Sequence, residues 1–92
     1  MIVSFKHKGL KRLYEKGDAR GLDNRLLPRI EEILTVLSAG DSPECADLPG
    51  FRLHTLIGNL DGFWSIKVNR NYRIIFSFDG EGFTDIDLLD YH

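Results

Sequence analysis

Three residues that can move protons stand at the end of the 92-residue sequence: Asp90, Tyr91 and His92. A carboxylate, a phenol and an imidazole can each donate or accept a proton, and histidine does so near neutral pH. Chain ends often fray, so an ordinary tail is the alternative interpretation. Residues 83–89 alternate in a way that predicts a strand, with Ile86 and Leu88 inward. Such a strand would anchor the tail against a sheet.

A second set of candidates lies in residues 62–78, which contain Lys67, Arg70 and Arg73 but no acid. This region predicts two strands, 63–68 and 72–78, joined by the loop 69–71. A three-residue loop keeps the large apolar side chains together, whereas two or four residues would set Arg73 opposite Val68. The register therefore predicts Lys67 directly opposite Arg73 on a polar face. Opposed cations favour an anion between them, although both can simply extend into water.

This polar face suits the cleavage of RNA by its own 2′-hydroxyl group. The reaction needs a base for the hydroxyl, an acid for the leaving oxygen and cations for the phosphate. Arg73 and Lys67 can supply the charge, and the three residues of the tail can supply proton transfer. No metal or cofactor is required. Ser65 and His54 are expected on the same face, but any small sheet domain offers some polar face.

Composition excludes several other classes of protein. The sequence has no P-loop, no HExxH and no GxSxG motif, and its single Cys45 has no metal-ligand neighbours at useful spacing. No apolar run is long enough to span a bilayer, so a cytoplasmic location is expected. Residues 1–29 hold eight basic and three acidic side chains, although the net charge is −2. Folding could join this basic block to residues 62–78, unless the charge serves only solubility.

The pattern along the chain predicts a single α+β domain over residues 1–92. A short strand is expected at 2–5, followed by an αα-hairpin whose helices fall within 7–17 and 23–40. Residues 41–50 form a polar break with at most one helical turn. Four strands are then expected at 51–56, 63–68, 72–78 and 83–89. Helices segregated from an antiparallel sheet define the α+β class.

Three stretches resemble the HigB toxins of the RelE/ParE superfamily of type II toxin–antitoxin systems. They are "FKHKGLKRLYEKG" near the start, "LHTLIGNLDGFWSIKVNRNYRIIFSF" in the middle and "DIDLLDYH" at the very end, so the resemblance extends over nearly the whole chain. The resemblance implies a RelE-like fold, with a two-helix hairpin packed on a mostly antiparallel twisted sheet. It also implies cleavage of messenger RNA on the 70S ribosome. The implied partner is a HigA-type helix-turn-helix antitoxin, and operator DNA would be bound only through the antitoxin complex.

The resemblance also implies roles for individual residues. Arg73, in "NYR", is expected to contact the scissile phosphate, and the catalytic residues matched at the tail are Asp90, Tyr91 and His92. Residues expected to bind RNA or the ribosome are His54, Lys67, Arg70, Lys6 and Lys8. The sequence departs from some relatives in having Ile57 in place of a lysine and Asn69 in place of an arginine. The alternatives are a ParE-like binder of gyrase and a weakly active toxin retained for antitoxin binding and operon autoregulation.

Overall fold

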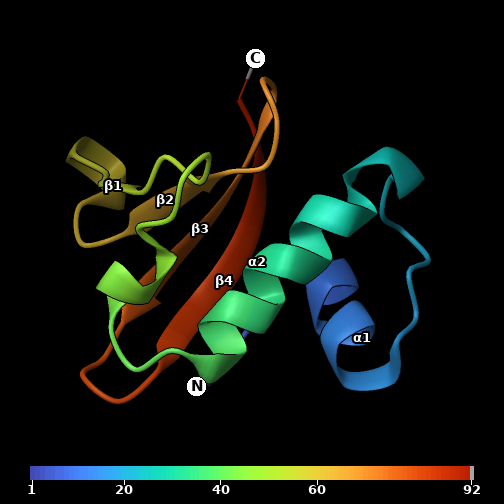
Figure 1. Ribbon diagram of the computed structural model, residues 1–92, viewed down its shortest axis with the longest axis horizontal. Coiled ribbons are helices and arrows are strands. Elements are labelled where there is room, and N and C mark those ends of the chain that lie inside the picture. Colours follow the sequence, from blue (N-terminus) through green and yellow to red (C-terminus); the bar gives the residue numbers. More distant parts are fainter. Residues whose placement is uncertain (92) are drawn as a thin grey trace.

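The computed structural model describes residues 1–91, and His92 lies outside the described residues. Two helices, α1 (Lys8–Lys16) and α2 (Leu27–Ala39), lie on one side of a four-stranded sheet (Figure 1). Its strands are β1 (His54–Thr55), β2 (Trp64–Lys67), β3 (Tyr72–Phe78) and β4 (Phe83–Asp90). Short 3₁₀ turns occur at Asn24–Leu26, Pro43–Ala46 and Gly58–Leu60. Within residues 1–91, no helix has the length and apolar character needed to cross a membrane.

Helix α1 begins and ends where local chemistry predicts. The imidazole of His7 accepts a hydrogen bond from the Leu10 N–H at 3.1 Å, which satisfies one of the free donors of the first turn. Gly17 ends the helix in a left-handed conformation, with φ of 67°. Leu10 is fully buried against the core, while the polar side chains of the helix remain exposed. The first predicted helix is therefore confirmed.

Helix α2 supplies the largest apolar stripe of the molecule. The Asp23 carboxylate caps the preceding 3₁₀ turn by accepting the Arg25 N–H at 2.9 Å, and Pro28 lies in the first turn of the helix. The buried residues of this stripe are Ile30, Ile33, Leu34 and Leu37. At the other end, a Cβ added to Gly40 would lie 2.2 Å from the Cys45 Sγ atom. Any side chain at this position would therefore force Cys45 to move.

The sheet has the order β1-β2-β3-β4 with antiparallel neighbours throughout, so the predicted α+β fold is confirmed. The predicted N-terminal strand is reduced to two isolated parallel bridges, Ile2 with Phe83 and Phe5 with Ile86. The strand predicted at 51–56 is also shorter, because only His54 and Thr55 join the ladder. Arg52 takes a left-handed conformation with φ of 52°, which interrupts the extended backbone.

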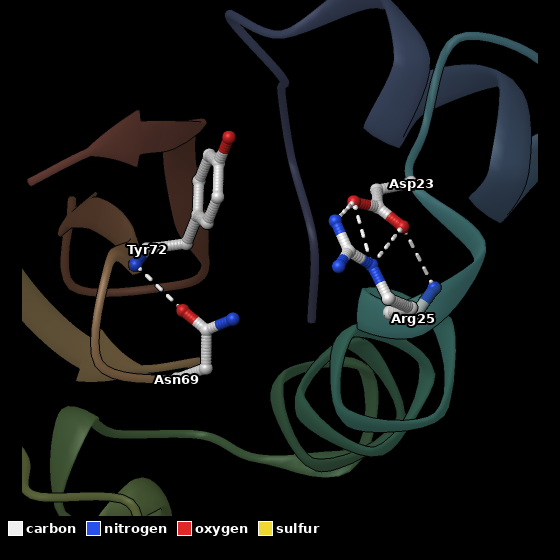
Figure 2. Close-up of polar contacts among 4 residues, drawn as sticks. All are labelled: Asp23, Arg25, Asn69 and Tyr72. Carbon is white, nitrogen blue, oxygen red and sulfur yellow. Dashed lines mark hydrogen bonds and ion pairs between the residues drawn. The ribbon is translucent and has the colours of Figure 1, made fainter.

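The register of the central hairpin agrees with the prediction from its apolar pattern. Ile66 pairs with Ile74, and Lys67 pairs with Arg73. The three-residue loop is closed by Asn69, whose Oδ1 atom accepts the N–H groups of Asn71 at 2.8 Å and Tyr72 at 2.9 Å; Figure 2 shows the bond from Tyr72. We call the helix-covered side of the sheet the inner face. The outer face is the opposite side, which carries Ser65, Lys67, Arg73, Ile75, Asp87, Leu89 and Tyr91.

Candidate functional site

Arg73 is the centre of the outer face. Its side chain is half-buried, and its Nη1 group donates a long hydrogen bond of 3.5 Å to the Oγ atom of Ser65. Ser65 is fully buried in β2, diagonally across the ladder from Arg73. Lys67 lies directly opposite Arg73, as predicted. The fold thus fixes two cations beside each other, one of them held by a buried hydroxyl group.

Tyr91 completes the environment of the guanidinium group. Its backbone N–H donates to the Asn71 carbonyl oxygen at 2.5 Å, so the chain just beyond β4 is hydrogen-bonded to the residue that precedes β3. The Arg73 Cζ atom lies 5.1 Å from the centroid of the Tyr91 ring, a cation–π distance. The ring is about half exposed, with a relative accessibility of 51%. Tyr91 therefore lies within reach of Arg73 as predicted, whereas His92 is outside the described residues.

Asp90 lies on the inner face, which corrects the expectation that the whole tail gathers beside the cations. It pairs with Tyr72, and residues opposite each other in a ladder share a face. Asp90 lines a hollow of about 350 Å³ together with His7, Asp23 and Tyr72. The sheet therefore separates the Asp90 carboxylate from Arg73. The physical reason is strand alternation, because two consecutive residues cannot both project to one side.

The remaining candidate residues for binding RNA or the ribosome lie on different elements around Arg73. His54, in β1, pairs with Ser65 and is exposed, with its Nδ1 atom 3.0 Å from the Arg52 carbonyl oxygen. Arg70 is exposed in the loop that joins β2 and β3. Lys6 is exposed at the opposite edge, where its N–H donates to the Ile86 carbonyl oxygen at 2.8 Å, and β4 separates it from Arg73. The exposed Lys8 begins α1.

The N-terminal basic block does not present all its cations freely. Arg20 and Arg25 each form an ion pair of 2.8 Å with the aspartate two residues earlier, Asp18 and Asp23 (Figure 2 shows the second pair). The side-chain hydrogen bond from each arginine lowers the pKa of its partner carboxylate to about 2. The predicted joining of the two basic blocks into one patch therefore does not include Arg20 and Arg25, and Lys6 lies across β4 from Arg73.

Both departures from the family pattern have structural counterparts. Asn69 closes the β2–β3 loop, so an arginine at this position would remove the acceptor for two backbone N–H groups. Ile57 projects into solvent with a relative accessibility of 88%, so it makes little contribution to the core. Sequence reasoning placed Ser65 on this face but gave it no role. Its diagonal position relative to Arg73 could have indicated this contact, because a long side chain can bridge that separation.

Metal binding has little support in the described part of the chain. Among residues 1–91, no three histidine, cysteine, aspartate or glutamate side chains are grouped so that they could hold a metal ion. The thiol of Cys45 lies behind α2, where burial raises its pKa, and the Sγ atom lies 3.9 Å from the Val36 carbonyl oxygen. A partly buried thiol with a raised pKa is a weak nucleophile.

Comparisons with known proteins agree with this architecture. A family model described as "RelE-like toxin of type II toxin-antitoxin system HigB" matches residues 3–92. The chain is 39% identical to Endoribonuclease HigB of Proteus vulgaris over 93 residues, covering 100% of both proteins. It is 34% identical to Toxin HigB-1 of Vibrio cholerae over 84 residues, covering 85% of this chain and 84% of that toxin.

A solved structure extends the likeness to the fold. The YoeB–YefM complex of Staphylococcus aureus contains a chain that superimposes with a TM-score of 0.63 at 18% identity, covering 100% of this chain and 98% of the other. At this identity the likeness concerns the fold alone. The family model and the Proteus vulgaris relative extend over the residues of the outer face, and the Vibrio cholerae relative covers most of the chain. The chain belongs to the HigB family of RelE-like toxins of type II toxin–antitoxin systems.

Proposed function

We propose that this toxin is an endoribonuclease that cleaves messenger RNA on the 70S ribosome and thereby inhibits translation. The observation that carries the proposal is the Arg73 guanidinium group, held on the outer face between Ser65 and Tyr91 and opposite Lys67. A relative from Proteus vulgaris that aligns over its full length is named an endoribonuclease. Dependence on the ribosome is inferred from the family resemblance.

The proposed reaction is an attack by the RNA 2′-hydroxyl oxygen on the adjacent phosphorus. The bond from phosphorus to the 5′ oxygen breaks, which leaves a 2′,3′-cyclic phosphate and a free 5′-hydroxyl. One group must remove the proton of the 2′-hydroxyl, and another must protonate the leaving oxygen. Arg73 and Lys67 stabilise the extra negative charge on the phosphate in the transition state. Side chains of the protein carry every step of this scheme.

The proposed proton transfers fall to the end of the chain. The Tyr91 hydroxyl belongs to a half-exposed side chain beside Arg73, so RNA bound there can reach it. His92 is adjacent in sequence, and an imidazole is suited to either role near neutral pH. Asp90 keeps its proposed part only through a rearrangement of the chain end, because it lies across the sheet from Arg73. Catalytic hydrogen bonds often form only when the substrate is bound.

The outer cations are proposed to hold the RNA and the ribosome. His54 lies on the β1–β2 side of Arg73 and Arg70 lies in the β2–β3 loop, while Lys6 and Lys8 lie beyond β4. Such contacts to phosphates fix orientation without reading sequence, and they weaken as salt concentration rises. We therefore assign these four residues to binding. Arg73 and Lys67 contact the reacting phosphate.

The proposed partner that neutralises the toxin is a HigA-type helix-turn-helix antitoxin. Support comes from family membership and from a heterotetrameric YoeB–YefM toxin–antitoxin complex of Staphylococcus aureus, which contains a chain of the same fold. We propose that operator DNA is bound only through the antitoxin component. The proposed location is the cytoplasm, because that is where ribosomes translate.

The substitution Arg73→Ala tests the catalytic proposal. The 5′ ends of messenger RNA on ribosomes are mapped after brief induction of each variant. Loss of a charge-stabilising donor at the reacting centre reduces the rate by roughly 10²–10³-fold. We therefore expect the wild-type protein to generate new 5′ ends within translated codons, and Arg73→Ala to generate few or none.

The matched control is Arg20→Ala, which removes an exposed arginine that is paired with Asp18 far from the outer face. It is expected to cleave like the wild type. Thermal unfolding of each variant is measured to check that it is folded. A folded Arg73→Ala variant that cleaves at the wild-type rate would refute the assignment. DNA damage without cleavage of messenger RNA would instead indicate a gyrase-binding toxin.

A further inference from the structure

Strand β4 contains one more residue than its partner can pair with. Phe78 pairs with Phe83, and Ser77 pairs with Thr84, whereas the next residues are shifted so that Ile75 pairs with Asp87. Two residues of β4, Asp85 and Ile86, therefore face the single residue Phe76. Asp85 is exposed and has a left-handed conformation with φ of 53°. These are the features of a β-bulge, in which the extra residue is left unpaired.

The bulge is held in place from the neighbouring segment. The backbone N–H of Asp85 donates to the Oγ atom of Ser4 at 3.0 Å, and the N–H of Ile86 donates to the Ser4 carbonyl oxygen at 3.2 Å. Aspartate tolerates the left-handed region better than most residues with a side chain. The first segment of the chain thus secures the irregular point of β4.

The bulge decides which side chains of β4 reach each face. Phe83 and Ile86 are both fully buried on the inner face, although they are three residues apart. A regular strand alternates with period two, so a regular β4 with Phe83 inward would send Ile86 outward and Tyr91 inward. With the bulge at Asp85, Ile86 turns inward and Tyr91 projects from the outer face.

We propose that the bulge at Asp85 selects Tyr91, and not Asp90, as the neighbour of Arg73. Asp85 and Ser4 are then positioning residues for the site, since neither touches Arg73. The opposite register would place the Asp90 carboxylate against the guanidinium group. Such an ion pair would neutralise the charge that binds phosphate. The consequence for cleavage rests on the proposed function, but the geometric claim does not.

Two single deletions in the same strand separate the alternatives. Deletion of Asp85 removes the extra residue and restores a regular ladder. Because the strand is then one residue shorter, the residues after position 85 keep their partners, and Tyr91 is expected to stay on the outer face. Deletion of Asp87 removes a paired residue while the bulge remains. The side chains after position 87 are then expected to change face. The loss of stability should be small, because Leu89 takes the place of Leu88 opposite Ile74 on the inner face. Tyr91 would turn inward and Asp90 outward.

The readout is the NMR ring-current shift that an aromatic ring above Arg73 imposes on the Arg73 side-chain protons. The shift is expected in the wild type and after deletion of Asp85, and it should disappear after deletion of Asp87. Adding Asp90→Tyr to the Asp87 deletion should restore it, because the new tyrosine then lies on the outer face directly opposite Arg73. Ribosomal cleavage should follow the same order, with a loss of roughly tenfold or more for the Asp87 deletion alone.

The outcomes separate the two proposals. If the Asp87 deletion keeps the ring-current shift, the inference about the bulge is wrong, whatever the cleavage rate. If the shifts follow the expected order but cleavage does not change, the bulge still positions Tyr91 and its proposed role in catalysis fails. If either deletion variant is unfolded, the ring-current shift is measured in Asp85→Gly instead. Glycine retains the residue count and the left-handed backbone, so loss of the shift in that variant would also overturn the inference.

Discussion

The two faces of the sheet use burial differently. On the inner face, Ile66, Ile74 and Phe76 are fully buried among apolar neighbours. On the outer face, Ser65 is equally buried, but its hydroxyl group contacts the guanidinium group of Arg73. Burial on the inner face contributes stability through the hydrophobic effect. Burial on the outer face removes water from one side of a charged group, which strengthens its electrostatic interactions. Substitutions on the two faces should therefore affect different properties.

The largest expected effect comes from Phe76→Ala on the inner face. The Phe76 ring meets that of Phe83 edge to face, with 5.1 Å between their centroids. Truncation leaves a cavity and should lower the free energy of unfolding by about 3–5 kcal/mol. Denaturant unfolding measures the loss. The matched control is Ser77→Ala on the next residue, where about 1 kcal/mol is expected from its hydroxyl contact with Thr84. Equal losses would contradict the contrast between the faces.

The inner face was largely predictable from the sequence. The apolar residues of the central hairpin follow period two without interruption, so only one loop length keeps Arg73 off the inner face. The pairing of Lys67 with Arg73 followed from that rule and is confirmed. Helix boundaries were similarly accessible, because Asp23 and Gly17 have the cap chemistry expected at those positions.

The outer face was less predictable, because it depends on single residues that leave the regular pattern. The left-handed conformation of Arg52 shortens β1, and no glycine or proline marks that position. The bulge at Asp85 had a weak signal: Phe83 and Ile86 are both apolar but three residues apart. A reading based on period two alone cannot assign both of them to one face. The separation of Asp90 from Tyr91 follows from alternation once the register is known.

A smaller effect on stability but a distinct effect on function is expected from Ser65→Ala. The change removes the acceptor for the Arg73 Nη1 group while leaving the apolar core intact. We expect the free energy of unfolding to fall by about 1 kcal/mol, and the cleavage rate at saturating ribosomes to fall by roughly tenfold. Single-turnover cleavage and denaturant unfolding measure the two quantities.

The neighbouring residue provides the comparison for Ser65. Ile66→Ala changes the other face of the same strand, where about 2–5 kcal/mol of stability should be lost. Its folded fraction should cleave at the wild-type rate. Ser65→Thr keeps the hydroxyl group and should recover most of the rate lost in Ser65→Ala. A Ser65→Ala variant with reduced stability and normal cleavage would show that the hydroxyl serves packing rather than Arg73.

The smallest expected effect is on the stability of the fold at low pH, to which ion pairs near the helices contribute. The hydrogen bond from Arg25 lowers the pKa of Asp23 in the folded protein to about 2, from an ordinary value of 3.8. A lowered pKa means that this carboxylate stabilises the fold above pH 3.8, and that the stabilisation is lost as the pH falls from 3.8 to about 2. Because the pair is exposed, the effect on stability should be small.

The substitution Asp23→Asn separates the charge from the cap. Asparagine retains a side-chain oxygen that can accept the Arg25 N–H, so the turn before α2 should persist. The plot of unfolding temperature against pH should become flatter below pH ~4, with little change at neutral pH. Asp18→Asn, which removes the equivalent pair with Arg20, should have a similar effect. If both variants keep the wild-type slope, the acid-labile groups lie elsewhere, for example at Asp79 in the β3–β4 turn, where backbone N–H groups of Gly82 and Glu81 lower the pKa of its carboxylate.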